Sequence, residues 1–164
     1  MILPKALAAP INRTPLPLVR QATRLIFARV LKRHPGLFDR LGAHARKSFR
    51  FTPTDLNLSF LIRPERRRIT VTRKAALGPA DASASGPLLM LLALLEGRLD
   101  GDAMFFDRTL SIAGDMEAIL ALRNALDDSG FDLPRDLGQA AGPFGALVTR
   151  IAEIIRRQAL ARLA

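Results

Sequence analysis

The sequence predicts an α+β fold, in which a small, largely antiparallel sheet of about five strands is covered by helices. Three observations lead to this prediction. Apolar and polar residues alternate in three short runs within 48–72, as in strands that bury one face. The run from Pro87 to Glu96 is apolar nearly all round, as in a buried helix. Apolar residues also recur at helical spacing in 18–33 and 115–128.

The first half of the chain begins with a segment that contains four prolines. We expect residues 1–17 to form an irregular arm, because proline interrupts helices and strands. A basic helix is predicted from about Leu18 to Arg33, ended by His34-Pro35-Gly36, and a short helix over 37–44. Three strands follow, with a turn at the RPERR segment between the second and the third. The predicted strands are 48–52, 56–62 and 68–72.

The second half alternates short strands with helices. A short extended segment at 81–86 precedes the apolar helix, and another strand is expected at 105–112. Asp115 is predicted to be the N-cap of the next helix. Residues 131–145 are rich in proline and glycine and are expected to form a linker. An amphipathic helix is predicted over about 143–163.

The composition narrows the possible functions. Lys and Arg total 25 against 15 Asp and Glu, so the net charge of +10 favours nucleic acid, anionic lipid headgroups or an acidic protein as partner. The absence of cysteine excludes disulfides, thiolate metal sites and cysteine nucleophiles. The only aromatic residues are nine phenylalanines, a poor set for base stacking. The longest apolar run, Gly86–Leu95, is shorter than the roughly 20 residues that span a bilayer, so we expect a soluble or peripheral protein.

The sequence holds no convincing catalytic or metal-binding set. His34 and His44 lie beside no candidate serine nucleophile and are expected to be surface or loop histidines. Phosphate-cradling glycine motifs and a nucleophile elbow are absent. Asp100, Asp102 and Asp107 lack the glutamate that closes a calcium loop, and we interpret them as turn residues. We therefore expect a non-enzymatic protein without a cofactor or metal.

Three features leave alternatives open. The apolar helix is either ordinary core or the wall of a cavity for an apolar ligand, since a bound lipid chain can bury leucines as well as protein can. The basic terminal helices either pack on their own domain or contact anionic lipid. The cluster Arg63, Arg66, Arg67 and Arg68 either touches phosphates or forms a solvated hairpin tip.

A family resemblance favours the cavity. The stretch FFDRTLSIAGDMEAILALRNALDD (105–128) resembles the closing strand and helix of the sterol carrier protein domain. The preceding MLLALLEGRLDGDAMFF and the upstream LNLSFLIRPERRRITVTR fit that domain's apolar helix and central hairpin, so the resemblance covers about residues 37–129. Within this family, the phrase F-x-R-x-L-x-I-x-G-D-x-E, with Asn124 further on, resembles the UbiT-type accessory factors of oxygen-independent ubiquinone biosynthesis.

The resemblance implies an apolar cavity between sheet and helices that binds an isoprenoid quinone precursor or another lipid, such as a phospholipid. It also implies UbiU/UbiV-type hydroxylase proteins as partners, in the cytoplasm and peripheral at the inner membrane. The chain then divides into an arm and basic helix (1–36), a lipid-binding domain (37–130), and a linker with a C-terminal amphipathic helix (131–164).

Two sets of residues follow as candidates. The predicted cavity lining is Phe60, Ile62, Leu88, Leu91, Leu92, Leu95, Phe106 and Leu110. The predicted membrane contacts are Arg24, Phe27, Leu31, Phe144, Leu147, Arg150, Ile151 and Arg157. The alternative functions are a basic polyanion-binding module, whose affinity for nucleic acid would fall steeply with salt, and a non-catalytic adaptor that binds a protein partner through its terminal helices.

Overall fold

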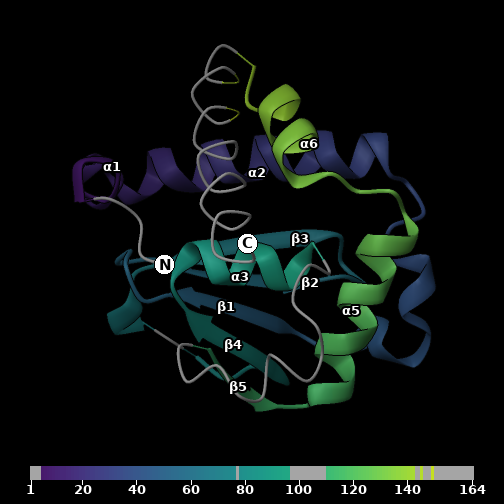
Figure 1. The fold of residues 1–164 in the computed structure, drawn as a ribbon. Helices are drawn as coiled ribbons and strands as arrows, with labels where there is room; N and C mark the ends of the chain where they lie inside the picture. The colour runs from purple at the N-terminus through teal and green to yellow at the C-terminus, as the bar shows by residue number, and fades with distance from the viewer. Residues whose placement is uncertain (1–4, 77, 97–109, 143–144, 146–148, 150–164) are drawn as a thin grey trace, which may run out of the picture.

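The computed structural model describes residues 5–76, 78–96, 110–142, 145 and 149, and shows a five-stranded sheet with helices packed against it (Figure 1). The predicted α+β fold is therefore confirmed. In chain order the elements are α1 (Lys5–Arg13), α2 (Leu16–Arg33), the 3-10 helix η1 (Asp39–Arg46), β1 (Phe49–Pro53), β2 (Ser59–Arg63), β3 (Arg68–Thr72), the 3-10 turn η2 (Lys74–Ala76), β4 (Ala82–Gly86), α3 (Leu88–Leu95), β5 (Ser111–Gly114), α5 (Met116–Asp128) and α6 (Leu133–Ala140).

The strand order across the sheet is β3-β2-β1-β4-β5. Three of the four neighbouring pairs are antiparallel, as predicted, and the central pair of β1 with β4 is parallel. β4 can run parallel to β1 because the chain leaves the edge strand β3 and returns across the sheet before it enters β4. β1 therefore lies at the centre of the sheet, with β3 and β5 at its two edges.

The register places the phenylalanines, the isoleucines and Val71 of β1, β2 and β3 on one face, whereas Leu61 lies on the other. Phe49 pairs with Ile62 on one side and with Ala82 on the other, and Phe51 pairs with Phe60 and Ala84. Helices α3 and α5 pack on this inner face and bury it (Figure 1). We call the larger cluster of buried residues the main core. It consists of Leu31, Leu37, Phe38, Leu41, Phe49, Phe51, Ala82, Ala84, Leu91, Leu94, Leu110, Ala118, Ile119, Leu122, Ala125 and Leu126.

Helix α2 lies along β3, the edge strand of the sheet (Figure 1). Its bounds agree with the predicted basic helix: Pro15 is the N-cap, Pro17 lies in the first turn, and His34 is the C-cap. Arg20 Nε donates a 2.9 Å hydrogen bond to the carbonyl of Val71, which is a residue of β3. In this way a helix side chain satisfies a backbone group of the edge strand.

Two predictions of irregular structure are wrong. Within the expected arm, residues 5–13 form α1 in spite of Pro10, because Ala8 and Ile11 bury apolar surface against the sheet side of the molecule. Within the expected linker, Leu133–Ala140 form α6. Pro134 stands in the first turn of α6, where proline is tolerated, and Asp132 caps the helix by accepting from the Arg135 N–H.

Other boundaries shift by a few residues. β2 begins at Ser59 rather than at residue 56, and the short helix is a 3-10 helix broken at Gly42. β5 continues past the predicted end to Gly114, whereas 105–109 lie outside the described residues. The predicted C-terminal helix over 143–163 also lies outside them, apart from residues 145 and 149.

The Gly114-Asp115 pair forms a tight corner between β5 and α5. Gly114 has φ +79°, and a Cβ atom added there would lie 2.3 Å from the carbonyl oxygen of Asp81. The next N–H, of Asp115, donates to that same oxygen at 2.9 Å. The Asp115 side chain accepts from the Ala118 N–H at 3.0 Å, which confirms the predicted N-cap. Glycine is required here because backbone approaches backbone.

Substituting Gly114→Ala is expected to lower the free energy of unfolding by about 3 kcal/mol, because the new Cβ meets backbone and the residue keeps a positive φ. The matched control is Gly130→Ala, since Gly130 has φ +65° but nothing within 4 Å of an added Cβ. The control should cost about 1 kcal/mol. Urea unfolding of both variants checks this, and equal losses would contradict the role of close approach.

Candidate functional site

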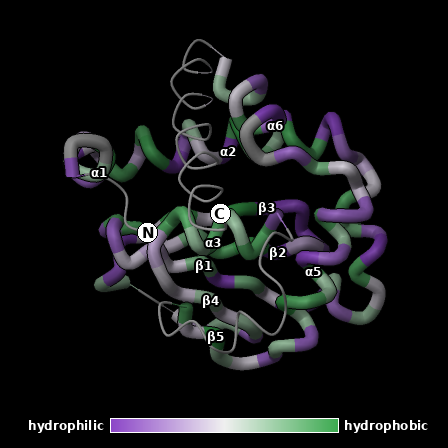
Figure 2. Tube along the Cα trace, viewed as in Figure 1, coloured by the Kyte–Doolittle hydropathy of each residue, from purple (hydrophilic) through white to green (hydrophobic). Residues whose placement is uncertain are grey.

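The apolar interior divides into two parts on either side of α3. The larger part is the main core. We call the smaller part the second cluster, whose buried members are Ala8, Leu56, Leu58, Val71 and Leu89. In Figure 2, hydrophobic residues run along α3, which contributes to both parts. The helix can do so because its sequence, LLMLLALL, offers an apolar side chain in every direction.

The residues predicted to line a cavity are distributed over both parts. Leu91 and Leu110 are buried in the main core, and Ile62 and Leu95 pack against it. Phe60 and Leu88 are half-buried against the second cluster. Leu92 is half-buried, and Phe106 lies outside the described residues. The described members of this set therefore divide between the two clusters, and Phe60 and Leu88 both pack against the second one.

The second cluster lies beneath the N-terminal helices. Ile11, Leu16 and Val19 of α1 and α2 are half-buried against it, and Ala8 belongs to it. We call α1 and the start of α2 the cover of the second cluster. Two polar contacts hold this cover in place: the Asn57 N–H donates to Asn12 Oδ1 at 2.7 Å, and Arg73 donates to the Thr14 carbonyl at 2.6 Å. The cover thus rests on small apolar contacts and a few hydrogen bonds, whereas the main core is covered by α5.

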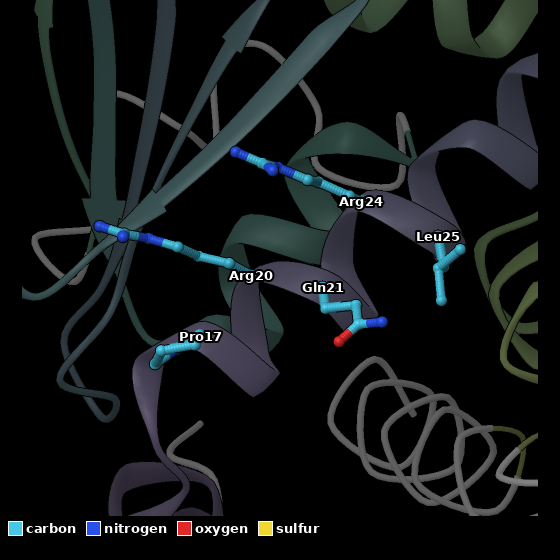
Figure 3. A pocket seen from close by; sticks show the side chains of 5 residues that line it. All are labelled: Pro17, Arg20, Gln21, Arg24 and Leu25. Carbon is cyan, nitrogen blue, oxygen red and sulfur yellow. The ribbon is translucent and has the colours of Figure 1, made fainter.

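A hollow of about 530 Å³ lies on α2, lined by Pro17, Arg20, Gln21, Arg24 and Leu25 (Figure 3). Arg20 and Arg24 extend to one side of the helix, toward the strands, and Gln21 and Leu25 extend to the other. None of the seven described residues of the predicted cavity lining lines this hollow.

The predicted membrane contacts have different surroundings. Arg24 is exposed and, among the described residues, has no ion-pair partner. Phe27 is half-buried, with its ring centroid 6.1 Å from that of Phe38. Leu31 is only 6% exposed and belongs to the main core, so we withdraw it as a membrane contact: this side of α2 packs inward. The remaining predicted contacts, Phe144, Leu147, Arg150, Ile151 and Arg157, lie outside the described residues.

Two leucines that the sequence analysis passed over are exposed on α2. Leu18 is 57% and Leu25 is 52% exposed, and these are the large exposed apolar side chains of the described residues. The signal in the sequence was that α2 is apolar on more than one side, whereas the sheet can cover only one of them. Two exposed leucines and the exposed Arg24 on the same helix give α2 both apolar and charged groups toward solvent.

A polar cluster joins α2 to α6. His34, expected to be a surface or loop histidine, directly follows α2 as its C-cap, but its side chain is half-buried in this cluster rather than on the surface. His34 Nε2 lies 3.1 Å from Oδ2 of Asp136, a carboxylate that is 1% exposed, and the ring of His34 packs edge-on to Phe131. The Asp132 N–H donates to the same oxygen at 2.9 Å. Burial alone would raise the pKa of Asp136, but these hydrogen bonds and neighbouring positive charge lower it below its usual value. The cluster ties two helices together.

Two further carboxylates at the end of the sheet are also held in the charged form. Asp115 pairs with Lys47, and that contact lowers the pKa of Asp115 most. Asp81 accepts from the hydroxyl and the backbone N–H of Ser48 at 2.6 and 2.7 Å, and these bonds lower its pKa. All of these acids have structural partners. In the described part of the chain, no group of three or more possible metal ligands occurs, and no helix is long and apolar enough to span a membrane.

Comparison with known proteins identifies the family. The model of the SCP-2 sterol transfer family matches residues 27–127. The chain belongs to this family. The matched SCP-2 segment holds all five strands with α3 and nearly all of α5, and it leaves α1, the first half of α2 and α6 outside. The cover of the second cluster is therefore contributed mostly by residues that precede the SCP-2 match.

A solved structure shares the fold of this chain. A UbiJ-SCP2 ubiquinone synthesis protein is 22% identical with a TM-score of 0.57, covering 73% of this chain and 98% of that one. Sterol carrier protein 2 from Yarrowia lipolytica (14% identity, TM-score 0.44, 65% and 91% covered) is a more distant neighbour. Sterol carrier protein domain 2 of Helicoverpa armigera is another, with 16% identity and a TM-score of 0.43, covering 62% of this chain and 80% of that one. The sequence comparison with curated proteins found no significant match.

The substitution Asp136→Asn is expected to lower the free energy of unfolding by about 1–3 kcal/mol at neutral pH, because buried donors lose a charged acceptor. The folded-state pKa of Asp136 is lowered, so its stabilisation is present above the unfolded-state pKa and is lost as pH falls through the folded value. Unfolding measured from pH 6 down to about pH 2 should show the difference between the parent protein and the variant shrink below about pH 4.

The control for this experiment is Asp128→Asn. Asp128 pairs with Arg40 on the surface, where the two side chains are 59% and 56% exposed. Such a pair contributes about 0–1 kcal/mol. An equal loss in both variants would mean that the buried cluster does not stabilise the α2–α6 contact.

Proposed function

We propose that this protein is a non-catalytic accessory factor of ubiquinone biosynthesis that binds a lipid in its apolar interior. The observation that carries the proposal is the match to the SCP-2 sterol transfer family over the residues that form both apolar clusters. The likeness in fold to a protein described as a ubiquinone synthesis protein supports the choice of pathway. An isoprenoid quinone precursor is the proposed ligand, with a phospholipid as the other lipid class.

The second cluster is the proposed site of the lipid chain. Its cover consists of α1 and the start of α2, which bury only small or half-exposed apolar side chains there. A chain that enters from the side of Phe60 and Leu88 would replace protein contacts with its own methylene groups. Each buried methylene contributes about 0.8 kcal/mol, so a prenyl chain can offset the displacement of the cover.

Anionic membrane is the proposed docking surface of the N-terminal helices. Residues 1–38 contain seven Lys or Arg and no Asp or Glu. Leu18 and Leu25 are exposed beside Arg24 and the hollow on α2, so apolar side chains and positive charge are available on one helix. This combination is typical of helices that lie in the interface of anionic bilayers.

The finer assignment rests on the resemblance to UbiT-type factors. We propose that the protein acts in the oxygen-independent pathway and presents its lipid to UbiU/UbiV-type hydroxylase proteins, in the cytoplasm at the inner membrane. The Gly114-Asp115 corner and Glu117, in the first turn of α5, belong to the phrase that carries this resemblance.

Protein purified without detergent should release an isoprenoid phenol, quinone or phospholipid when it is extracted with organic solvent and analysed by mass spectrometry. Leu88→Trp should reduce the molar ratio of lipid to protein severalfold, because Leu88 adjoins the second cluster. Leu95→Trp is the matched control, since Leu95 is a half-buried residue of the same helix that packs on the main core. Lipid-free parent protein, or equal effects of both variants, would contradict the proposed site.

The double substitution Leu18→Ser and Leu25→Ser should weaken binding to vesicles with anionic lipid about tenfold, since two exposed leucines no longer insert. Co-sedimentation with vesicles checks this result, and vesicles of neutral phosphatidylcholine are the control. The parent protein should bind neutral vesicles less than anionic ones. Binding that ignores the anionic lipid content would contradict docking by the basic helices.

A further inference from the structure

The outer face of the sheet is a surface that the lipid-binding proposal does not use. Because strand residues alternate, the outward positions are those between the buried phenylalanines. We call this surface the open face. Its outward positions include Arg50, Thr52, Leu61, Arg63, Arg68 and Thr70. Each of these six is half-buried or exposed. The surface is lined by hydroxyl groups and guanidinium groups.

Like charges lie directly opposite each other on this face. Arg63 of β2 pairs in register with Arg68 of β3, at the end of the hairpin. Like charges in opposite positions of neighbouring strands destabilise a sheet. No outward position of the five described strands holds an acidic residue that would relieve this repulsion. An anionic group bound between Arg63 and Arg68 would relieve this repulsion and stabilise the sheet.

The hairpin tip holds the arginines in place without neutralising them. The Glu65 N–H donates to the Ala45 carbonyl at 3.0 Å, and Arg67, with φ +47°, donates to the Pro35 carbonyl at 3.0 Å. The tip is thereby anchored to η1 and to the end of α2. In the described part of the chain, the Glu65 carboxylate makes no ion pair with Arg63 or Arg68.

The open face lacks the features that nucleic acid or a membrane would use. Single-stranded nucleic acid on a sheet stacks on aromatic side chains, but Phe49, Phe51 and Phe60 all point to the inner face. A membrane takes up exposed apolar side chains, and the large exposed ones, Leu18 and Leu25, lie on α2. A guanidinium group can donate two parallel hydrogen bonds to one carboxylate, which suits an acidic protein segment as the partner.

We propose that the open face docks a protein partner through an acidic segment, whose carboxylates pair with Arg63 and Arg68. Arg50 of β1 also lies on the open face, where it pairs in register with Leu61 of β2. Its guanidinium group donates to the carbonyls of Gly78 and Pro79. Thr70 next to Arg68 supplies hydroxyl contacts for the backbone or side chains of the partner. The docking surface and the lipid site lie on opposite faces of the sheet, so both can be occupied at once.

The test uses a short synthetic peptide of alternating glutamate and threonine, with binding followed by fluorescence anisotropy on the full chain. The double variant Arg63→Glu/Arg68→Glu should bind the peptide about tenfold or more weakly. Lys5→Glu/Arg13→Glu is the control, because it makes the same change in net charge on exposed α1 positions. Amide signals of Arg63, Arg68 and Thr70 should shift on peptide addition in NMR spectra.

A single variant separates docking from folding. In Arg68→Glu the opposed pair becomes complementary, so thermal stability should rise while peptide binding falls. Equal loss of binding in the two double variants would overturn the proposal, as would tighter binding of an oligonucleotide or of anionic vesicles through Arg63 and Arg68. Lipid content, measured on the same samples, should stay unchanged, so failure here is distinct from failure of the lipid-binding proposal.

Discussion

The arrangement of this protein depends on the pairing of large with small side chains at the centre of the sheet. In the parallel pair, Phe49 and Phe51 of β1 lie next to Ala82 and Ala84 of β4. The small residues leave room above β4, and α3 contacts both strands there. Because α3 is apolar on all sides, it buries surface both toward α5 and toward the N-terminal helices. The two apolar regions of the interior, and hence the position of the proposed lipid site, follow from this close approach.

Much of this fold could be predicted because its signals are local. The alternation around Phe49, Phe60 and Val71 gave the strands, and the capping residue Asp115 gave the start of α5. The proline-rich segments are helical against expectation. In α6 the proline stands in the first turn, where it is tolerated, and in α1 burial compensates for the hydrogen bond lost at Pro10. Ala8 is buried and Ile11 is half-buried against residues far along the chain, and no local pattern shows this.

The candidate site was less predictable than the fold, for a related reason. Side-chain direction on a strand depends on register, and register became visible only from the pairs such as Phe51 with Phe60. The composition of α3 indicates an apolar wall, but it cannot say that Leu88 and Leu95 face different clusters. His34 and Asp136 are separated by about a hundred residues, so their contact had no sequence signal. Leu31 was assigned to the membrane because a helix with two apolar sides does not reveal which one faces inward.

The hydrogen bond from Arg20 to Val71 also bears on self-association. The backbone of an uncovered edge strand can pair with the edge of another molecule and start aggregation. In this protein α2 occupies that position along β3, although the first half of α2 precedes the family match. The N-terminal helices therefore protect the edge of the sheet as well as cover the second cluster. Movement of these helices away from the sheet would expose a template for strand addition at the same moment as it opened the interior.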